Sequence, residues 1–186
     1  MRQLISFNLI TLDGFFEGPN HDISWHNVDK EFDDFSIEQL DTAGVLLFGR
    51  VTYELMASFW PSEVAHANDP LVADKMNSLS KVVFSRTLEK ADWNNTRLVK
   101  ADVAREIAKL KQQSGKDLFL FGSADLATTL IKLGLIDEYR VLLNPLVLGK
   151  GSPLFKGIDQ PFTLKLIKTR TFQNGNILLY YQPDKI

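Results

Sequence analysis

The stretch Gly49-Arg50-Val51-Thr52 joins residue types that could bind an anion. It follows the apolar run Val45–Phe48 and opens a segment with helical spacing. The first N–H groups of a helix carry partial positive charge, and glycine lets a phosphate approach the backbone closely. Arg50 offers a planar guanidinium group for a terminal phosphate, and the Thr52 hydroxyl could cap the helix or donate to the ligand. Taken alone, the motif fits an ordinary turn with a surface arginine better.

Two further junctions share this design. The apolar run Asp117–Phe121 leads through Gly122-Ser123 into a helical pattern, and Ser85-Arg86 follows a third apolar run. Ligands of open α/β sheets bind at the carboxyl ends of strands. Each junction alone could be a helix cap or a solvated arginine. Three of them in one chain together predict a dinucleotide site, and two arginines favour NADP over NAD.

A long loop, Thr11–Trp25, follows the first apolar run and is rich in glycine and aromatic residues. Loops of this length in a compact domain are often functional. This loop could close over a ring-shaped ligand, although Asp13-Gly14 could equally be a simple turn and Trp25 a core residue. Asp29 opens the next helical pattern, where the helix dipole by itself favours an acid.

Composition excludes several classes of function. The chain has 186 residues, 45% of them hydrophobic and 24% charged, with a net charge of −2. Neither nucleic-acid binding nor membrane attachment is expected from a balance of this kind, and a cytoplasmic location is the default. The absence of cysteine excludes disulfides, thiolate nucleophiles and cysteine-ligated zinc. Three histidines without metal-ligand spacing are interpreted as surface residues, so no metal site is predicted.

Short apolar runs that alternate with amphipathic segments predict an α/β fold in one domain, residues 1–186. Strands are expected at Gln3–Ile10, Val45–Phe48, Lys81–Phe84, Arg97–Val99 and Asp117–Phe121, and in the later segments YRVLLNP, FTLKLIKTRTF and NILLYYQ. The Asn-Gly pair between the last two segments is a strong hairpin signal. The sheet should therefore begin like a wound α/β sheet and end in an antiparallel hairpin.

Helices are expected between these strands, at Asp29–Leu40, Thr52–Phe59, Val103–Gln113 and Ala124–Leu133. Asp102 and Ser123 are the predicted N-caps of the last two helices, and Gly134 should end the last one. The glycine- and proline-rich segment LVLGKGSPLF, before the final hairpin, could border a ligand cleft or a subunit contact.

In their order along the chain, five segments resemble the dihydrofolate reductase superfamily. They are TLDGFFEG, LLFGRVTYE, KVVFSRT, the long segment from LFLFGSADLATTL to GKGSPLF, and the terminal hairpin. The closer resemblance is to the reductase domain at the C-terminus of bifunctional riboflavin-pathway deaminase-reductases, in stand-alone form. This resemblance covers nearly the whole chain. It implies a three-layer fold with a mostly parallel central sheet flanked by helices, NADPH lying across that sheet, and a homodimer.

The resemblance also assigns residues by motif. Gly49, Arg50, Val51 and Thr52 would contact the pyrophosphate and adenosine side of NADPH, and Ser85 and Arg86 its 2′-phosphoadenosine. The pyrophosphate near the nicotinamide would be wrapped by Gly122, Ser123, Ala124, Asp125 and Leu126. The nicotinamide and the substrate would be flanked by Thr11, Leu12, Asp13 and Gly14, with Trp25 behind the loop.

Two positions depart from the riboflavin-pathway pattern. An acid that commonly precedes the glycine turn is Phe121 here, and a lysine six positions before the loop aspartate is Phe7. Both polar substrate contacts have become aromatic, which argues against a ribosyl-pyrimidine substrate. Phe7 and Phe121, with Phe15, Phe16 and Trp25, could instead form a stacking slot. The chain has no H-x-E and no P-C-x-x-C motif, so zinc hydrolytic chemistry is not expected.

The sequence therefore predicts an NADPH-dependent reductase of a small heteroaromatic or conjugated C=N or C=O compound. The proton would come from water or from Asp13 or Asp29, and such an acid would need a raised pKa. The alternatives are reduction of 5-amino-6-(5-phosphoribosylamino)uracil in riboflavin biosynthesis, reduction of a dihydrofolate or other pterin, or NADPH binding without turnover.

Overall fold

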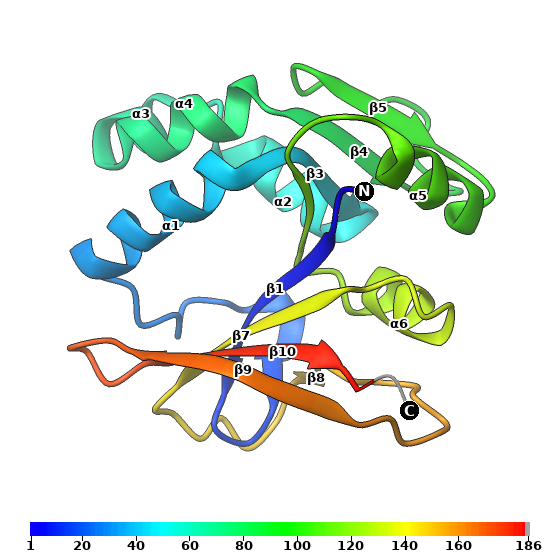
Figure 1. The fold of residues 1–186 in the computed structure, drawn as a ribbon. Helices are drawn as coiled ribbons and strands as arrows, with labels where there is room; N and C mark the ends of the chain where they lie inside the picture. Colours follow the sequence, from blue (N-terminus) through cyan, green and yellow to red (C-terminus); the bar gives the residue numbers. More distant parts are fainter. Residues whose placement is uncertain (185–186) are drawn as a thin grey trace.

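An eight-stranded sheet in the order β5-β4-β3-β6-β1-β7-β10-β9 forms the centre of the molecule (Figure 1). The computed structural model describes residues 1–184. The strands are β1 Leu4–Thr11, β3 Ala43–Gly49, β4 Ser80–Phe84, β5 Thr96–Val99, β6 Asp117–Phe121, β7 Glu138–Asn144, β9 Leu164–Thr171 and β10 Ile177–Pro183. The central strands are continuous apolar runs because both of their faces are covered by helices.

The sheet is parallel from β5 to β7 and antiparallel at its end. β10 pairs antiparallel with β7 and with β9. The backbone N–H of Gly175 donates to the carbonyl of Phe172 in the connecting turn, where Gly175 has a φ of 90°. The predicted mostly parallel sheet with a terminal hairpin is thus confirmed. A separate small ladder between β2, Phe15–Glu17, and β8, Ser152–Pro153, was not predicted.

Six α-helices and one 3-10 turn connect the strands within residues 1–184. They are η1 Pro19–His21, α1 Lys30–Thr42, α2 Arg50–Phe59, α3 Glu63–Asn68, α4 Pro70–Ser78, α5 Val103–Gln112 and α6 Ala124–Lys132. The sequence reading missed α3 and α4, which are short and follow one another directly. Among these helices, none has the length and apolar character needed to cross a bilayer.

The structure decides between the roles considered for Thr52 and refines the cap predicted at Ser123. α2 begins at Arg50, with Gly49 as its N-cap, so Thr52 lies inside the helix and does not cap it. Ser123 does occupy the N-cap position of α6, but its side chain makes no capping hydrogen bond. The third predicted cap is confirmed, because the Asp102 carboxylate accepts a hydrogen bond from the Arg105 amide at 3.0 Å.

Two helical layers enclose the sheet. On one face, α5 and α6 bury Ile107 and Leu130 against β3 and β6. On the other face, α1, α2 and α4 pack Tyr53 and Met76 against the opposite sides of the same strands. Figure 1 shows α1 and α6 on opposite sides of β1.

This layering creates the site. β3 and β6 are neighbours in the sheet, yet α2 leaves β3 toward one face and α6 leaves β6 toward the other. The carboxyl ends of adjacent strands whose connections diverge in this way border a crevice, the usual ligand position in open α/β sheets.

Candidate functional site

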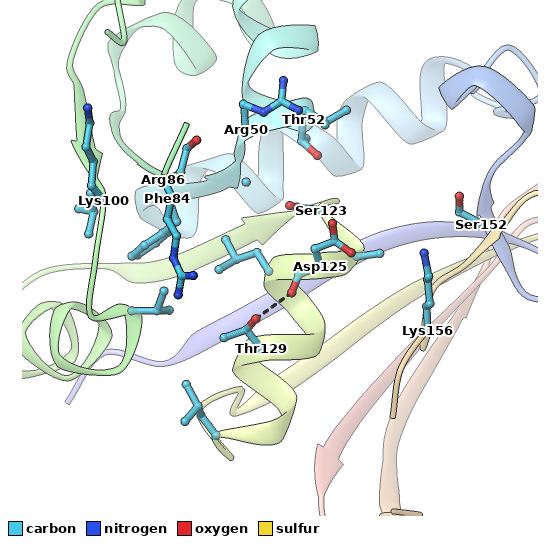
Figure 2. A pocket seen from close by; sticks show the side chains of 18 of the residues that line it. Arg50, Thr52, Phe84, Arg86, Lys100, Ser123, Asp125, Thr129, Ser152 and Lys156 are labelled. Carbon is cyan, nitrogen blue, oxygen red and sulfur yellow. Dashed lines mark hydrogen bonds between the residues drawn. The ribbon is translucent and has the colours of Figure 1, made fainter. Parts of the chain in front are cut away.

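A cavity of about 730 Å³ lies at the carboxyl ends of β3, β4, β5 and β6 (Figure 2). This volume is within the usual range for small-molecule sites, about 300–1,000 Å³. Its lining comes from seven segments of the chain: Phe16, Glu17 and His21; Gly49 to Thr52; Phe84 to Arg86; Val99 to Ala104; Ser123 to Leu126; Thr129 and Leu133; Ser152 and Lys156.

The floor of the cavity is made by two turns that interlock. A Cβ atom on Gly49 would lie 1.9 Å from Ser123 Oγ, so only glycine lets the turn after β3 approach the turn after β6. Conversely, a Cβ atom on Gly122 would lie 3.2 Å from the Thr52 side chain, and the φ of 59° at Gly122 is a conformation that favours glycine. The N-termini of α2 and α6 therefore open side by side.

Of the three helix N-termini that line the cavity, those of α2 and α6 lack a side-chain cap and that of α5 is capped. No capping hydrogen bond comes from Gly49 or Ser123, whereas Asp29, Ser62 and Asp102 cap α1, α3 and α5. An uncapped N-terminus presents backbone N–H groups that still need an acceptor. With two such ends at one cavity, the backbone is suited to binding a negatively charged group such as a pyrophosphate.

Cationic side chains lie on both sides of the cavity, which also has Glu17, Asp102 and Asp125 in its lining. In Figure 2, Arg86 and Lys100 lie on one side of the α6 N-terminus, and Ser152 and Lys156 lie on the other. Within residues 1–184, Arg86, Lys100 and Lys156 form no ion pair. Arg50 is committed to Glu54, with its Nη1 2.9 Å from Glu54 Oε2.

The predicted cofactor residues converge on this cavity. All of them line it except Gly122, which packs beneath it against Thr52. The segment LVLGKGSPLF also reaches the cavity, through Ser152 and Lys156.

The predicted donor Asp13 is instead a link between two loops. Its carboxylate accepts hydrogen bonds from Thr11 Oγ1 at 2.6 Å, from the Gly149 amide at 2.7 Å and from the Leu148 amide at 3.1 Å. The Thr11 contact, together with the two backbone amides, lowers the pKa of Asp13 from 3.8 to about 2. Proton donation near neutrality would require a shift in the opposite direction. Gly14, with a φ of 88°, forms the adjoining turn.

The second predicted donor also has a structural contact. Asp29 accepts a hydrogen bond from the Phe32 amide at 3.0 Å and caps α1. Trp25 lies with its ring edge-on to His26, 4.6 Å between centroids, and its Nε1 donates to the Asp22 carbonyl. His26 is half-buried, which departs in part from the predicted surface position, and burial lowers its pKa to about 4; His21 and His66 are exposed as predicted. None of Asp29, Trp25 and His26 lines the cavity.

Two of the aromatic residues predicted to contact substrate, Phe7 and Phe121, pack into a cluster of buried rings. Phe7 is only 6% exposed, and its ring meets those of Phe35 and Phe121 at centroid distances of 5.8 and 5.9 Å. These contacts stabilise the core and leave little of Phe7 for a ligand. Of the five aromatic residues considered for a stacking slot, Phe16 alone lines the cavity.

Several lining residues were not predicted, among them Glu17, His21 and Lys100. Glu17 and His21 reach the cavity because β2 pairs with β8, a contact between short segments far apart in sequence. Lys100 lies directly after β5 and shortly before Asp102. Its position at the end of a strand could have indicated from the sequence that it lines the cavity.

Comparisons with known proteins agree with this architecture. The family model of the RibD C-terminal domain matches residues 2–178. The uncharacterized protein YyaP of Bacillus subtilis is 38% identical over 182 residues, which cover 97% of this chain and 94% of YyaP.

Solved structures share the fold. A putative riboflavin biosynthesis protein from Shewanella superposes with a TM-score of 0.75 at 23% identity, covering 98% of this chain and 99% of that one. A deaminase/5-amino-6-(5-phosphoribosylamino)uracil reductase from Thermotoga maritima gives 0.71 at 14% identity, over 98% of this chain and 57% of its own. Dihydrofolate reductase from Enterococcus faecalis, complexed with NADP(H), superposes with a TM-score of 0.66 at 14% identity. The superposition covers 98% of this chain and 97% of the reductase.

Proposed function

Since the chain belongs to the RibD C-terminal domain family, we propose that it is an NADPH-dependent reductase of a small heteroaromatic or conjugated compound with a C=N or C=O bond. One observation carries this proposal. Gly49 and Ser123 bring two uncapped helix N-termini together at one cavity, and Arg86 and Lys100, which form no ion pair within residues 1–184, lie on one side of it. A dinucleotide phosphate needs this combination of contacts.

The proposed orientation of NADPH follows from the charges. The pyrophosphate would lie at the N-termini of α2 and α6, where backbone N–H groups can donate to it. The 2′-phosphate would lie toward Arg86 and Lys100, two cations without ion pairs in residues 1–184. The nicotinamide would then extend past the α6 N-terminus toward Ser152. Asp102 and Asp125 are exposed acids in the same lining. NADPH would have to bind with its phosphates away from these two carboxylates, because like charges repel.

The chain would mainly hold the cofactor and the acceptor in place and shield them from water. When bound, NADPH supplies a hydride to the acceptor. The residues of the cavity would hold the two reactants in contact, which removes most of the entropic cost of their meeting. Phe16 and the β2–β8 ladder would cover the nicotinamide end and limit the access of water.

The acceptor is proposed to be uncharged in its reacting part. Phe7 and Phe121 stand where a lysine and an acid would suit a ribosyl-pyrimidine substrate, and the two rings are packed edge to face. Because neither ring offers a polar contact, we expect an acceptor that does not depend on these two contacts, such as an aromatic or quinone-like compound. The alternatives are reduction of 5-amino-6-(5-phosphoribosylamino)uracil or of a dihydropterin. The following experiment distinguishes these two substrates from an aromatic or quinone-like acceptor.

The test is oxidation of NADPH, followed as the loss of absorbance at 340 nm, with three acceptors in parallel: menadione, 7,8-dihydrofolate and 5-amino-6-(5-phosphoribosylamino)uracil. We expect turnover with at least one of them. Ser123→Glu places a negative charge at the α6 N-terminus and should abolish NADPH binding and turnover. Ser114→Glu, on an exposed turn outside the cavity, is the matched control and should keep both. NADPH binding without oxidation of any acceptor would instead favour a binding module.

A further inference from the structure

One end of the cavity holds a histidine–carboxylate pair for which binding of the dinucleotide has no use. His21 Nδ1 lies 2.8 Å from Glu17 Oε2, and both residues line the cavity. The Glu17 side chain is 12% exposed and that of His21 is 60% exposed. A mostly buried carboxylate therefore holds an imidazole that remains open to the cavity and to solvent.

The pair is fixed by the surrounding backbone. Glu17 ends β2 and lies opposite Ser152 in the β2–β8 ladder. Gly151 packs so closely on this strand that a Cβ atom there would lie 2.2 Å from the Glu17 carbonyl oxygen. The Asp13 carboxylate links the start of the same loop to the amides of Leu148 and Gly149. The carboxylate that contacts His21 therefore has a defined position.

The backbone at His21 adopts an uncommon conformation. Asn20 and His21 both have positive φ, 59° and 60°, in η1. Residues other than glycine seldom adopt this region, and where they do, the surrounding structure has to hold them there. Such conformations are concentrated at functional sites. Here the conformation accompanies the contact of the His21 ring with Glu17, four residues earlier.

The position of the pair along the cavity identifies what it would face. Glu17 is paired with Ser152, and Figure 2 shows Ser152 and Lys156 on the far side of the α6 N-terminus from Arg86 and Lys100. In the proposed orientation the 2′-phosphate lies at the Arg86 end. The His21–Glu17 pair would therefore lie at the nicotinamide end, where the acceptor must also bind.

The reduction needs a proton donor, and the acids first considered do not supply one. Asp13 and Asp29 lie outside the cavity lining and are engaged in structural hydrogen bonds. Histidine exchanges protons close to neutral pH, which makes it the commonest general acid. With Nδ1 bonded to Glu17, Nε2 is the nitrogen left to donate to a ligand.

We propose that His21 donates the proton that completes the reduction and that Glu17 is its positioning residue; this inference rests on the proposed function. A C–H bond forms as the acceptor carbon gains the hydride, and the electron pair of the C=N or C=O bond moves to the heteroatom. The heteroatom takes the proton from Nε2 of His21. NADP⁺ and a neutral imidazole remain, and the exposed imidazole regains its proton from water.

Other charged groups face the same cavity. Lys156 lies at the nicotinamide end, Arg50 and Asp125 lie at the helix N-termini, and no described residue is paired with Lys156. Because these charges share the cavity with His21, kinetics alone would not assign an effect to His21. The experiment therefore combines a signal specific to His21 with kinetic variants.

The first measurement is NMR of the protein labelled with ¹⁵N-histidine. The chain has three histidines, so the spectrum contains signals from only three imidazole groups. Saturation with NADP⁺ should shift the His21 signals. Saturation with 2′,5′-ADP, which carries the phosphates of the adenosine half but no nicotinamide, should shift them much less. His66, exposed on α3 and outside the cavity lining, is the internal control and should not move. Signals are assigned with His21→Gln and His66→Gln.

The second measurement is kinetic and uses whichever of menadione, 7,8-dihydrofolate and 5-amino-6-(5-phosphoribosylamino)uracil is turned over fastest. His21→Gln should lower kcat by about 100-fold or more, the usual contribution of a general acid, while the Kd for NADPH from calorimetry stays within about twofold. Glu17→Gln should lower kcat less and displace the pH profile, because the amide still accepts a hydrogen bond but carries no charge. His66→Gln should match the wild type.

The outcomes distinguish a failure of the role of His21 from a failure of the proposed reductase function. A His21 signal that stays unmoved while NADP⁺ binds, or a His21→Gln variant with unchanged kcat and pH profile, overturns the role of His21 and leaves the proposed function intact. Failure of NADPH and NADP⁺ to bind at all removes the proposed function, and the role of His21 with it.

Discussion

The Ser123 hydroxyl fills the space next to Gly49 so closely that a Cβ atom on residue 49 would lie 1.9 Å from Ser123 Oγ. Through this contact the turn after β3 and the turn after β6 form one surface. The N-termini of α2 and α6 open side by side as a consequence, and the proposed cofactor site depends on that arrangement.

Gly49→Ala should separate the two turns. The added methyl group forces the Ser123 side chain, and with it the α6 N-terminus, to move, and overpacking of this kind costs about 1–3 kcal/mol of unfolding free energy. The Kd for NADPH should rise in parallel. Adding Ser123→Ala removes the clashing hydroxyl, so the double variant should recover part of both losses, with Ser123→Ala alone as the control. Chemical denaturation and calorimetry measure the two effects, and additive losses in the double variant would contradict the close contact.

Arg86→Ala should weaken NADPH binding more than NADH binding. A charge-assisted contact is worth about 1.5–3 kcal/mol, which corresponds to roughly a 10- to 150-fold rise in the Kd for NADPH. NADH has no 2′-phosphate, so its Kd should barely change. Arg50→Ala should have a smaller effect, because Arg50 is paired with Glu54. Arg97→Ala, which disrupts an ion pair with Glu106 outside the cavity, is the matched control. Equal losses for both nucleotides would place the 2′-phosphate elsewhere.

Asp13→Asn should loosen the link between the loop after β1 and residues 148–149. The folded pKa of Asp13, about 2, is below its ordinary value of 3.8. The unfolded chain therefore takes up the proton first as the pH falls, and the stabilisation present above pH 3.8 is lost as the pH approaches 2. The free energy of unfolding of the wild type, measured with urea, should fall over this interval. Asp13→Asn should have a lower free energy of unfolding at pH 7, and this value should change less with pH below pH 4. Asp184→Asn, at an exposed position near the C-terminus, is the control. Identical acid profiles for wild type and Asp13→Asn would contradict the assigned contacts.

The residues of the proposed cofactor site could be predicted to lie together because their signals are local. Gly49-Arg50, Ser85-Arg86 and Gly122-Ser123 each follow a buried strand within one or two residues, and parallel neighbours bring such strand ends to one edge of a sheet. The hairpin was predictable for the same reason, because Asn174-Gly175 specifies its own turn.

The contacts at the other end of the cavity, where we propose that the nicotinamide lies, could not be predicted in this way. Glu17 reaches its position through a ladder to Ser152, and Asp13 bonds to an amide 135 residues further along the chain. The sequence shows an acid in a loop but not the three donors that lower its pKa. The predicted stacking slot is not formed, for a similar reason. Phe7 and Phe121 lie on neighbouring strands, and their rings meet each other before they can meet a ligand.

A homodimer remains a prediction, and β9 is the surface on which we expect it. β9 is an edge strand of the sheet, and its residues Leu166 and Ile167 are 49% and 46% exposed. An edge of this kind is usually covered or charged, since its backbone groups can pair with another chain. The double variant Leu166→Lys/Ile167→Lys should sediment as a monomer, and Val64→Lys, at an exposed apolar residue of α3, should not change the oligomeric state. A monomeric wild type would contradict this expectation.

Calorimetric titration of the wild-type chain with NADPH, beside NADH, tests most directly that the paired N-termini of α2 and α6 bind a nicotinamide dinucleotide phosphate. We predict saturable binding at one site per chain, a lower Kd for NADPH than for NADH, and loss of binding in Ser123→Glu. The absence of heat at millimolar NADPH, or equal binding by the wild type and Ser123→Glu, would contradict it.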